Sequence, residues 1–163
     1  MTPPPDSADD LDFRRVLGHF ASGLTIITGV SDGRRFGLTC QAFSSVSLDP
    51  PLVAFYVIKA SLSSDALRDA GMFCVNILAR DQQDVARIFA VSGADKFKDV
   101  ATSDSPAGLP IINGSIAWID CAVESVFDAG DHDGVIGAVN ALGHLSNAKP
   151  LLFFRGGYGT FES

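Results

Sequence analysis

An acid–histidine–acid run interrupts an otherwise apolar stretch of the sequence. Residues 129–139, AGDHDGVIGAV, place Asp131, His132 and Asp133 on a segment whose composition predicts a tight turn. A metal site is poorly supported there, because three adjacent residues on one turn cannot all point at one ion. Two alternatives remain: a plain hairpin tip, for which Asp and Gly are common residues, and a polar group that faces a substrate.

A second polar stretch lies where a strand is expected. Residues 38–55, LTCQAFSSVSLDPPLVAF, begin with Thr, Gln and Ser side chains and become wholly apolar after the Asp-Pro-Pro sequence at 49–51. The polar side chains are too many for a simple half-buried strand, and they could face a flat ligand with polar edges. The alternative is a solvent-facing edge strand whose hydroxyls bond water, and these residues alone favour that alternative.

Two cationic positions could bind an anion. Residues 59–61, Lys59, Ala60 and Ser61, join the end of a predicted strand to the start of a predicted helix. Free N–H groups and the helix dipole attract anions at such a position, but a simple serine cap beside a solvated lysine is an equal alternative. Lys96 and Phe97 follow another predicted helix, and in isolation they are typical of a protein surface.

Several standard catalytic signatures are missing. The sequence has neither a G-x-x-x-x-G-K-[ST] phosphate loop nor a G-x-G-x-x-G dinucleotide loop. His19, His132 and His144 lie at spacings that match no metal-ligand set, so no metal site is predicted. Metal hydrolysis and nucleophilic catalysis are therefore poorly supported, which favours chemistry carried by a bound cofactor.

The elements expected around these residues form a mainly β domain. Apolar spacing predicts three short helices, over residues 11–23 with Gly23 as the stop, from the Ser61 cap to Gly71, and over 81–91 with Val85, Ile88 and Phe89 on one side. Strands are predicted as a hairpin over 24–48, a central strand over 52–58, a buried strand over 72–78, two long strands over 115–130 and 134–146, and a final strand over 150–156. Residues 92–114 are expected to form a loop. Roughly six or seven strands joined mostly by tight turns favour a small antiparallel barrel with short peripheral helices over a doubly wound sheet.

Length and composition indicate one soluble domain. The chain has 163 residues, 47% of them hydrophobic and 19% charged, and its longest apolar run, residues 52–58, is too short for a membrane-spanning helix. The net charge of −7 argues against binding to nucleic acid or to an anionic membrane. Residues 1–10 are predicted to be a disordered tail rather than a leader, which indicates a cytoplasmic protein with one domain over 11–163. Three cysteines without CxxC spacing are expected to be reduced thiols: Cys40, Cys74 and Cys121.

In combination these motifs resemble the flavin reductase domain family. The resemblance covers residues 11–161 and rests on an ordered set: TCQAFSSVSLDPPLV, Lys59-Ala60-Ser61, FCVNIL, IFA, Lys96-Phe97, AGDH and LLFFRGGYG. It implies an FMN-binding split β-barrel that is a homodimer with flavin near the subunit interface. It also implies that NADH or NADPH reduces FMN or FAD, by hydride transfer from nicotinamide C4 to flavin N5. The reduced flavin then diffuses to a partner flavin-dependent monooxygenase, of the kind that serves aromatic catabolism.

The same resemblance implies a role for each group of site residues. Thr39, Cys40, Gln41, Ala42 and Phe43, with Ser47, line the isoalloxazine ring. Lys59, Ala60 and Ser61 hold the phosphate and ribityl chain, and Ile77, Leu78, Lys96 and Phe97 complete the pocket. The nicotinamide side is faced by His132, the expected catalytic residue, and by Tyr158.

Two other classes of protein stay open beside the reductase. A flavin- or haem-binding protein of the same architecture could lack reductase turnover, since fold does not decide function. An unliganded interaction module would leave the polar strand and the His132 turn unexplained. The sequence does not distinguish FMN from FAD, or NADH from NADPH.

Overall fold

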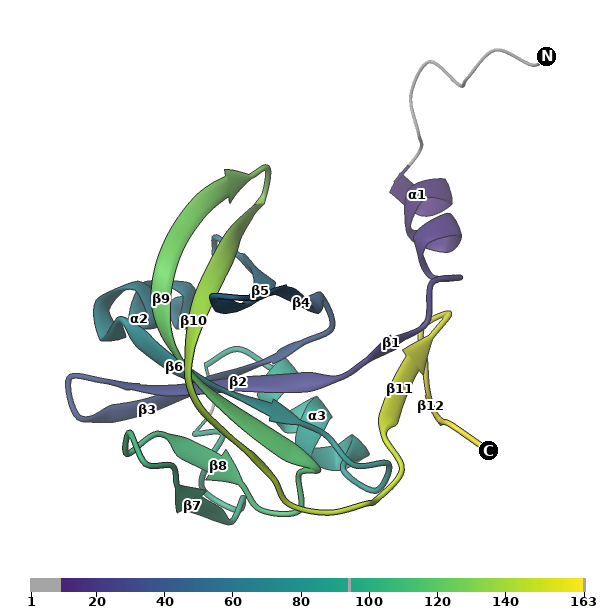
Figure 1. Ribbon diagram of the computed structural model, residues 1–163. Helices are drawn as coiled ribbons and strands as arrows, with labels where there is room; N and C mark the ends of the chain where they lie inside the picture. The colour runs from purple at the N-terminus through teal and green to yellow at the C-terminus, as the bar shows by residue number, and fades with distance from the viewer. Residues whose placement is uncertain (1–9, 94, 163) are drawn as a thin grey trace.

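A seven-stranded antiparallel sheet forms the body of the molecule (Figure 1). The computed structural model describes residues 10–93 and 95–162. Register shifts between β9 and β10 and between β4 and β5 bend the sheet, and β3 approaches β5, so that the sheet curls into a barrel. The predicted antiparallel split barrel is confirmed. In spatial order its strands are β3 (Arg34–Cys40), β2 (Thr25–Ser31), β6 (Met72–Ile77), β9 (Ala117–Ala129), β10 (His132–His144), β5 (Pro51–Ile58) and β4 (Phe43–Leu48).

Smaller elements surround this sheet. A three-stranded sheet joins the two ends of the chain, and it consists of β1 (Ser22–Gly23), β11 (Leu151–Phe154) and β12 (Gly157–Thr160). A separate hairpin pairs β7 (Thr102–Asp104) with β8 (Pro110–Ile112). The helices are α1 (Asp10–Leu17), α2 (Leu62–Ala70) and α3 (Gln83–Ala90), and α1 stands clear of the barrel in Figure 1. None of the described helices is long and apolar enough to cross a membrane.

The large sheet is buried on both faces at β2. Neighbouring residues of β2 illustrate this, because Ile26 and Ile27 are both fully buried but belong to different hydrophobic clusters. Ile27 packs with Phe55 and Phe73 inside the barrel, whereas Ile26 packs with Phe89 of α3 on the other face. Helix α3 is therefore fixed against β2 and β3, the strands that carry one wall of the site described below.

Both predicted ends of α2 are confirmed. The Ser61 hydroxyl oxygen accepts a hydrogen bond from the Ser63 N–H at 3.2 Å, as expected of an N-cap. At the other end Gly71 adopts a left-handed conformation, with φ of 67°, and donates its N–H to the carbonyl of Leu67. These local signals position the start of α2 at the end of β5.

Predicted boundaries at the N-terminal end were wrong. Helix α1 ends at Leu17 rather than at Gly23, because Ser22 and Gly23 pair with Phe153 and Leu152 of β11. This pairing joins segments far apart in the sequence, so helical spacing gave no sign of it. The tail predicted over residues 1–10 lies outside the described residues, apart from Asp10, which begins α1.

Four further expectations are corrected. Residues 92–114, expected to be loop, contain the β7–β8 hairpin, and the chain continues beyond β11 into β12. The run 36–48 is not one strand, since it breaks at Gln41 and Ala42 into β3 and β4, which lie at opposite edges of the large sheet. Ile88, expected on the same side of its helix as Val85 and Phe89, is 37% exposed, because α3 turns Ala86 and Phe89 inward.

Candidate active site

A cavity of about 500 Å³ opens between β3, β5 and the end of α3, and we call it the His132 cavity. This volume falls within the range of about 300–1,000 Å³ that is usual for small-molecule sites. Eight residues predicted from the sequence line it: Thr39, Cys40, Gln41, Ala42, Ala60, Ser61, Lys96 and His132. They come from segments separated by up to 93 positions in the chain, between Thr39 and His132, so the fold alone brings them together.

The lining combines apolar walls with a polar edge. Leu38, Val57 and Phe89 supply apolar surface from β3, β5 and α3, and Gln41 and Lys96 supply polar groups. This combination suits a flat ligand whose faces are apolar and whose edges form hydrogen bonds. The alternative of a purely solvent-facing polar strand therefore does not describe these residues.

Backbone donors are available where β3 passes into β4. Gln41 and Ala42 lie between the two strands, so their N–H groups belong to neither ladder. The Ala42 carbonyl accepts the N–H of Tyr56 at 3.2 Å, which holds this link against β5. On the other side, the Thr39 hydroxyl donates to the carbonyl of Ala86 in α3 at 2.6 Å. The threonine hydroxyl of the polar strand therefore holds the strand against α3, and the peptide N–H groups remain available to bind a ligand.

The cysteine of this strand is not an activated nucleophile. Cys40 is buried, and burial raises the pKa of its thiol to about 11. A thiol with such a pKa is protonated at neutral pH. Residues 29–33, GVSDG, match the letters of a serine elbow, but they form the end of β2 and the turn into β3 rather than a strand-to-helix turn.

The acid–histidine–acid run sits at the β9–β10 hairpin as predicted. The turn itself consists of Gly130 and Asp131, and β10 begins at His132. His132 and Asp133 are adjacent residues of a strand and therefore point to opposite faces. His132 lines the cavity, whereas Asp133 is buried and accepts hydrogen bonds from Arg68 of α2 and from the Ser64 hydroxyl at 3.4 Å.

Asp131 orients the imidazole of His132. Its carboxylate lies 2.7 Å from His132 Nδ1, and this contact holds the pKa of Asp131 below its usual range. Since an ionised carboxylate can only accept, Nδ1 carries the proton and Nε2 is left for a ligand. Within residues 10–93 and 95–162, no cluster of three or more His, Cys, Asp and Glu side chains could hold a metal ion.

Lys59 is engaged by the same hairpin. Its ammonium donates to the Asp128 carboxylate and, at 2.7 Å, to the carbonyl of Gly130. The ion pair lowers the pKa of Asp128. These contacts hold Lys59 against the turn that precedes His132. Lys59 is not among the residues that line the cavity, and its contact with a phosphate stays a prediction.

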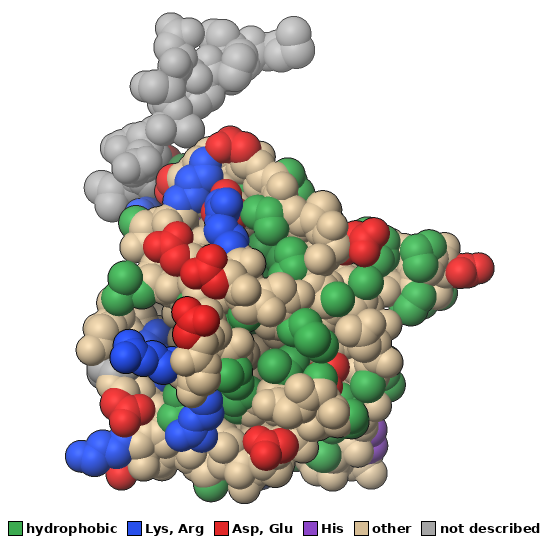
Figure 2. All heavy atoms as spheres, turned by 90° about the vertical axis from the view of Figure 1, so that its left-hand side faces the viewer, with side chains coloured by type: hydrophobic (Ala, Val, Ile, Leu, Met, Phe, Trp, Pro, Cys, Tyr) green, Lys and Arg blue, Asp and Glu red, His purple; other side chains and the backbone are tan. Residues whose placement is uncertain are grey.

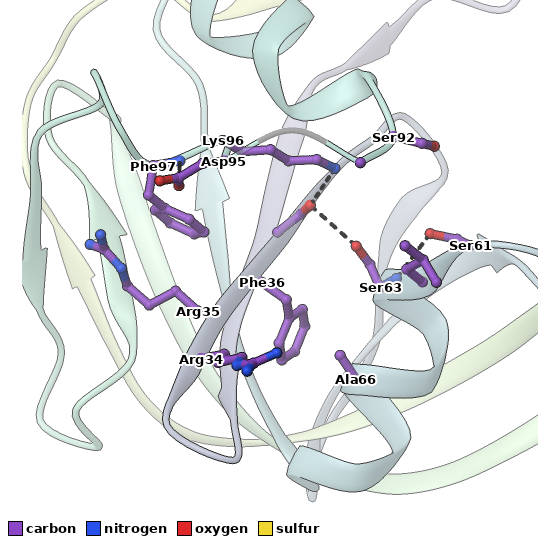
Figure 3. Close-up of a pocket in the computed structure, with 13 residues that line it drawn as sticks. Arg34, Arg35, Phe36, Ser61, Ser63, Ala66, Ser92, Asp95, Lys96 and Phe97 are labelled. Carbon is purple, nitrogen blue, oxygen red and sulfur yellow. Dashed lines mark hydrogen bonds between the residues drawn. The ribbon is translucent and has the colours of Figure 1, made fainter.

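A second cavity, of about 490 Å³, adjoins the first (Figure 3), and we call it the Arg34 cavity. The two share Ser61, Ser92 and Lys96. The Lys96 ammonium reaches the carbonyls of Gly37 at 2.8 Å and Phe89 at 3.1 Å, and partial burial lowers its pKa. Figure 3 shows Lys96 and the α2 residue Ser63 meeting this Gly37 carbonyl from opposite sides. These contacts hold β3, α2 and the segment after α3 around the junction of the cavities.

The remaining predicted residues lie elsewhere. Phe97 lines the Arg34 cavity. Phe43 and Ser47 are on β4, and Ile77 and Leu78 are at the end of β6, where Leu78 is fully buried in the core. Tyr158 is on β12, where its ring packs edge-on against Phe153. The structure does not bring these five into the His132 cavity: Phe43, Ser47, Ile77, Leu78 and Tyr158.

Sequence reasoning missed some of the lining. Tyr56 and Ile58 of β5 are 42% and 54% exposed, and both line the His132 cavity. No signal in the sequence marked them, because the run 52–58 is apolar throughout and was expected to be buried on both faces. Arg34 and Arg35 were missed as well, because they lie next to a hairpin turn and such positions are usually surface.

Fold and site together define an antiparallel split barrel with a cavity for a flat, polar-edged ligand and cations beside it. The family model of the flavin reductase like domain matches residues 17–162. The chain belongs to this family, and the resemblance noted in its motifs is confirmed.

Curated relatives and solved structures agree with the family. The chain is 45% identical over 157 residues to the reductase subunit HsaB of a flavin-dependent monooxygenase from Rhodococcus jostii, covering 96% of this chain and 80% of that one. It is 46% identical over 152 residues to a flavin reductase of Pseudomonas putida, covering 93% and 89%. A crystal structure of a nitrilotriacetate monooxygenase component B homologue from Mycobacterium thermoresistibile superposes with a TM-score of 0.91 at 47% identity, covering 94% and 87%.

Proposed function

We propose that this protein is the reductase component of a two-component flavin-dependent monooxygenase. It oxidises NADH or NADPH, reduces FMN or FAD, and releases the reduced flavin to a separate oxygenase. Membership of the flavin reductase like family and the names of the relatives support this activity. Because both nucleotide and flavin are intracellular metabolites, we place the reaction in the cytoplasm, in a single domain that spans residues 11–163.

One observation carries the proposal most directly. The His132 cavity gathers residues from the polar strand, the start of α2, the segment after α3 and the β9–β10 hairpin around one space of about 500 Å³. Apolar walls and free peptide N–H groups at Gln41 and Ala42 match the faces and edges of an isoalloxazine ring. No protein nucleophile is needed, and the protonated thiol of Cys40 supplies none.

The chain's own residues bind and orient the two reactants. The cofactors supply hydride transfer from nicotinamide to flavin, so the protein's contribution is positioning. Ser61 lies at the start of α2, where N–H groups and the helix dipole favour the flavin phosphate. His132, held through Nδ1 by Asp131, presents Nε2 as an acceptor for the nicotinamide carboxamide when the ring is neutral.

Anaerobic oxidation of NADH, with FMN, FAD and riboflavin supplied in turn, tests the activity. Purified protein is expected to accelerate flavin reduction well above the rate in buffer. Flavin binding measured in parallel by fluorescence gives the decisive comparison. If flavin binds while NADH and NADPH are oxidised only at the uncatalysed rate, the protein is a flavin-binding barrel without reductase turnover.

We also propose that the protein is a homodimer. Helix α1 stands clear of the barrel in Figure 1, and the apolar residues of α1 and of the turn after it are each more than half exposed: Phe13, Val16, Leu17 and Phe20. Contiguous apolar surface of this kind mostly marks an association site, and a second copy of the chain presents the same apolar helix. Analytical ultracentrifugation of the wild-type protein is expected to show a dimer. The double variant Phe13→Asp with Phe20→Asp should sediment as a monomer, whereas the control variant Ile88→Asp on α3 should remain a dimer. A monomeric wild-type protein contradicts the proposal.

A further inference from the structure

The turn that precedes His132 lies at an exposed end of the fold. Strands β9 and β10 rise beyond the rest of the large sheet and end in this turn (Figure 1), and acidic and basic side chains lie next to each other at this end, in the upper part of Figure 2. Gly130 in the turn has a left-handed conformation, with φ of 76°, and nothing in the described part of the chain except its neighbours in sequence lies within 4 Å of the position of a Cβ. Glycine is conformationally permissive, so a contact from another element can decide the shape of this turn.

Lys59 supplies such a contact from just beyond the end of β5. Its ammonium donates to the Gly130 carbonyl at 2.7 Å and to the Asp128 carboxylate, and its backbone N–H donates to the Asp131 carbonyl at 3.1 Å. The Asp128 carboxylate also accepts the Gly130 N–H at 3.3 Å. Lys59 therefore bonds, through its side chain or its backbone, three of the four residues that come directly before His132.

The strand beyond the turn is held by other contacts. Residues 132–138 of β10 pair with β5, and the buried Asp133 binds Arg68 of α2 on the face of β10 opposite to His132. The backbone position of β10 is therefore set without the side chain of Lys59. That side chain acts on the turn, and the turn carries the Asp131 carboxylate, which lies 2.7 Å from Nδ1 of His132.

We propose that Lys59 is a positioning residue for hydride transfer. Its ammonium fixes the turn through Gly130 and Asp128. The turn in turn holds the Asp131 carboxylate, which keeps Nε2 of His132 directed at the nicotinamide. Lys59 touches neither reactant in this assignment, since it does not line the His132 cavity. The inference rests on the proposed function, because it takes the nicotinamide to meet His132.

Stopped-flow measurement of flavin reduction at saturating NADH tests this role. Lys59→Ala should slow the limiting rate by about threefold to tenfold, as expected from the loss of an exposed ion pair and a charge-assisted hydrogen bond. Lys59→Arg can keep both contacts and should recover most of the rate. In a His132→Ala background, Lys59→Ala should change the rate by less than about twofold, because the imidazole that it positions is absent.

Lys149→Ala is the matched control. The side chains of Lys59 and Lys149 are 37% and 36% exposed, and each pairs with an exposed carboxylate, which for Lys149 is that of Glu162 at 2.8 Å. Lys149 lines neither cavity, so its loss should leave the rate of flavin reduction near wild type. Hydrogen exchange followed by mass spectrometry gives a readout without turnover: the peptide that contains residues 128–132 should exchange faster in Lys59→Ala and not in Lys149→Ala.

Several results would overturn this role. A loss of rate of the same size with and without His132 would mean that Lys59 does not act through the imidazole. A rise in the KM for NADH alone that disappears in high salt would assign Lys59 to direct attraction of the nucleotide, and a loss of affinity for FMN but not for riboflavin would place it at the flavin phosphate. Unchanged hydrogen exchange in Lys59→Ala would show that the turn keeps its shape without the lysine. A wild-type protein that reduces no flavin would instead overturn the proposed function itself.

Discussion

Ser61 has two separable roles, and one pair of substitutions distinguishes them. Its hydroxyl caps α2, and its position borders both cavities at the proposed phosphate. Asp and Asn cap a helix about as well as Ser. Ser61→Asp and Ser61→Asn therefore keep the cap and differ mainly in one negative charge, which only the first places beside the flavin phosphate.

The expected magnitudes follow from the surroundings of Ser61. Two like charges about 4 Å apart repel by roughly 1 kcal/mol in water and roughly 4 kcal/mol at the effective dielectric of a protein surface. Ser61 is half-buried at the mouth of the cavities, so Ser61→Asp should weaken FMN by about tenfold or more relative to Ser61→Asn. Loss of the cap in Ser61→Ala should lower the free energy of unfolding by about 1 kcal/mol, which corresponds to a fall in Tm of about 2–4 °C.

Affinities for FMN and riboflavin, together with thermal melting, check this reasoning. Riboflavin lacks the phosphate, so its Kd should be the same for the Asp and Asn variants. Both variants should melt near the wild-type temperature. A Ser61→Asp protein that binds FMN as tightly as Ser61→Asn refutes the placement of the phosphate at the start of α2, as does an equal loss of FMN and riboflavin.

Four further results are expected. His132→Ala should raise the KM for NADH or slow hydride transfer in stopped-flow measurements, with flavin Kd and Tm near wild type; normal turnover would show that the residue only forms the hairpin. Lys59→Ala should leave the ratio of FMN to riboflavin affinity unchanged, because its ammonium already bonds Asp128 and the Gly130 carbonyl, and a selective loss of FMN would place it at the phosphate after all. Cys40 should resist iodoacetamide at pH 8, as its pKa of about 11 leaves roughly one thiol in a thousand ionised; fast alkylation seen by mass spectrometry would contradict its burial. Since burial raises this pKa above its unfolded value, the free energy of unfolding should fall as pH rises from about 9 towards 11, and a flat dependence in denaturant titrations would contradict the shift.

Features governed by neighbouring residues were predictable from the sequence. The Ser61 cap and the Gly71 stop of α2 depend on hydrogen bonds and a backbone conformation within a few residues. The hairpin around Asp131 and the buried strand β6 depend on turn composition and apolar runs in the same way. The members of the site were found through the family resemblance of several weak motifs in order, and eight of them do share one cavity.

Tertiary structure decided which distant segments meet. The break at Gln41 and Ala42 exists because β4 pairs with β5 and not with the strand before it, and periodicity within 36–48 carries no information on that partner. The contact of the Lys59 ammonium with Asp128, 69 residues away, is likewise made by the fold, and no pattern around Lys59 indicates it. Arg34 and Arg35 became part of a site only when α2 and the segment around Lys96 closed a cavity over them. Local spacing reports the face on which a side chain lies, whereas the chain's long-range pairing determines what that side chain faces.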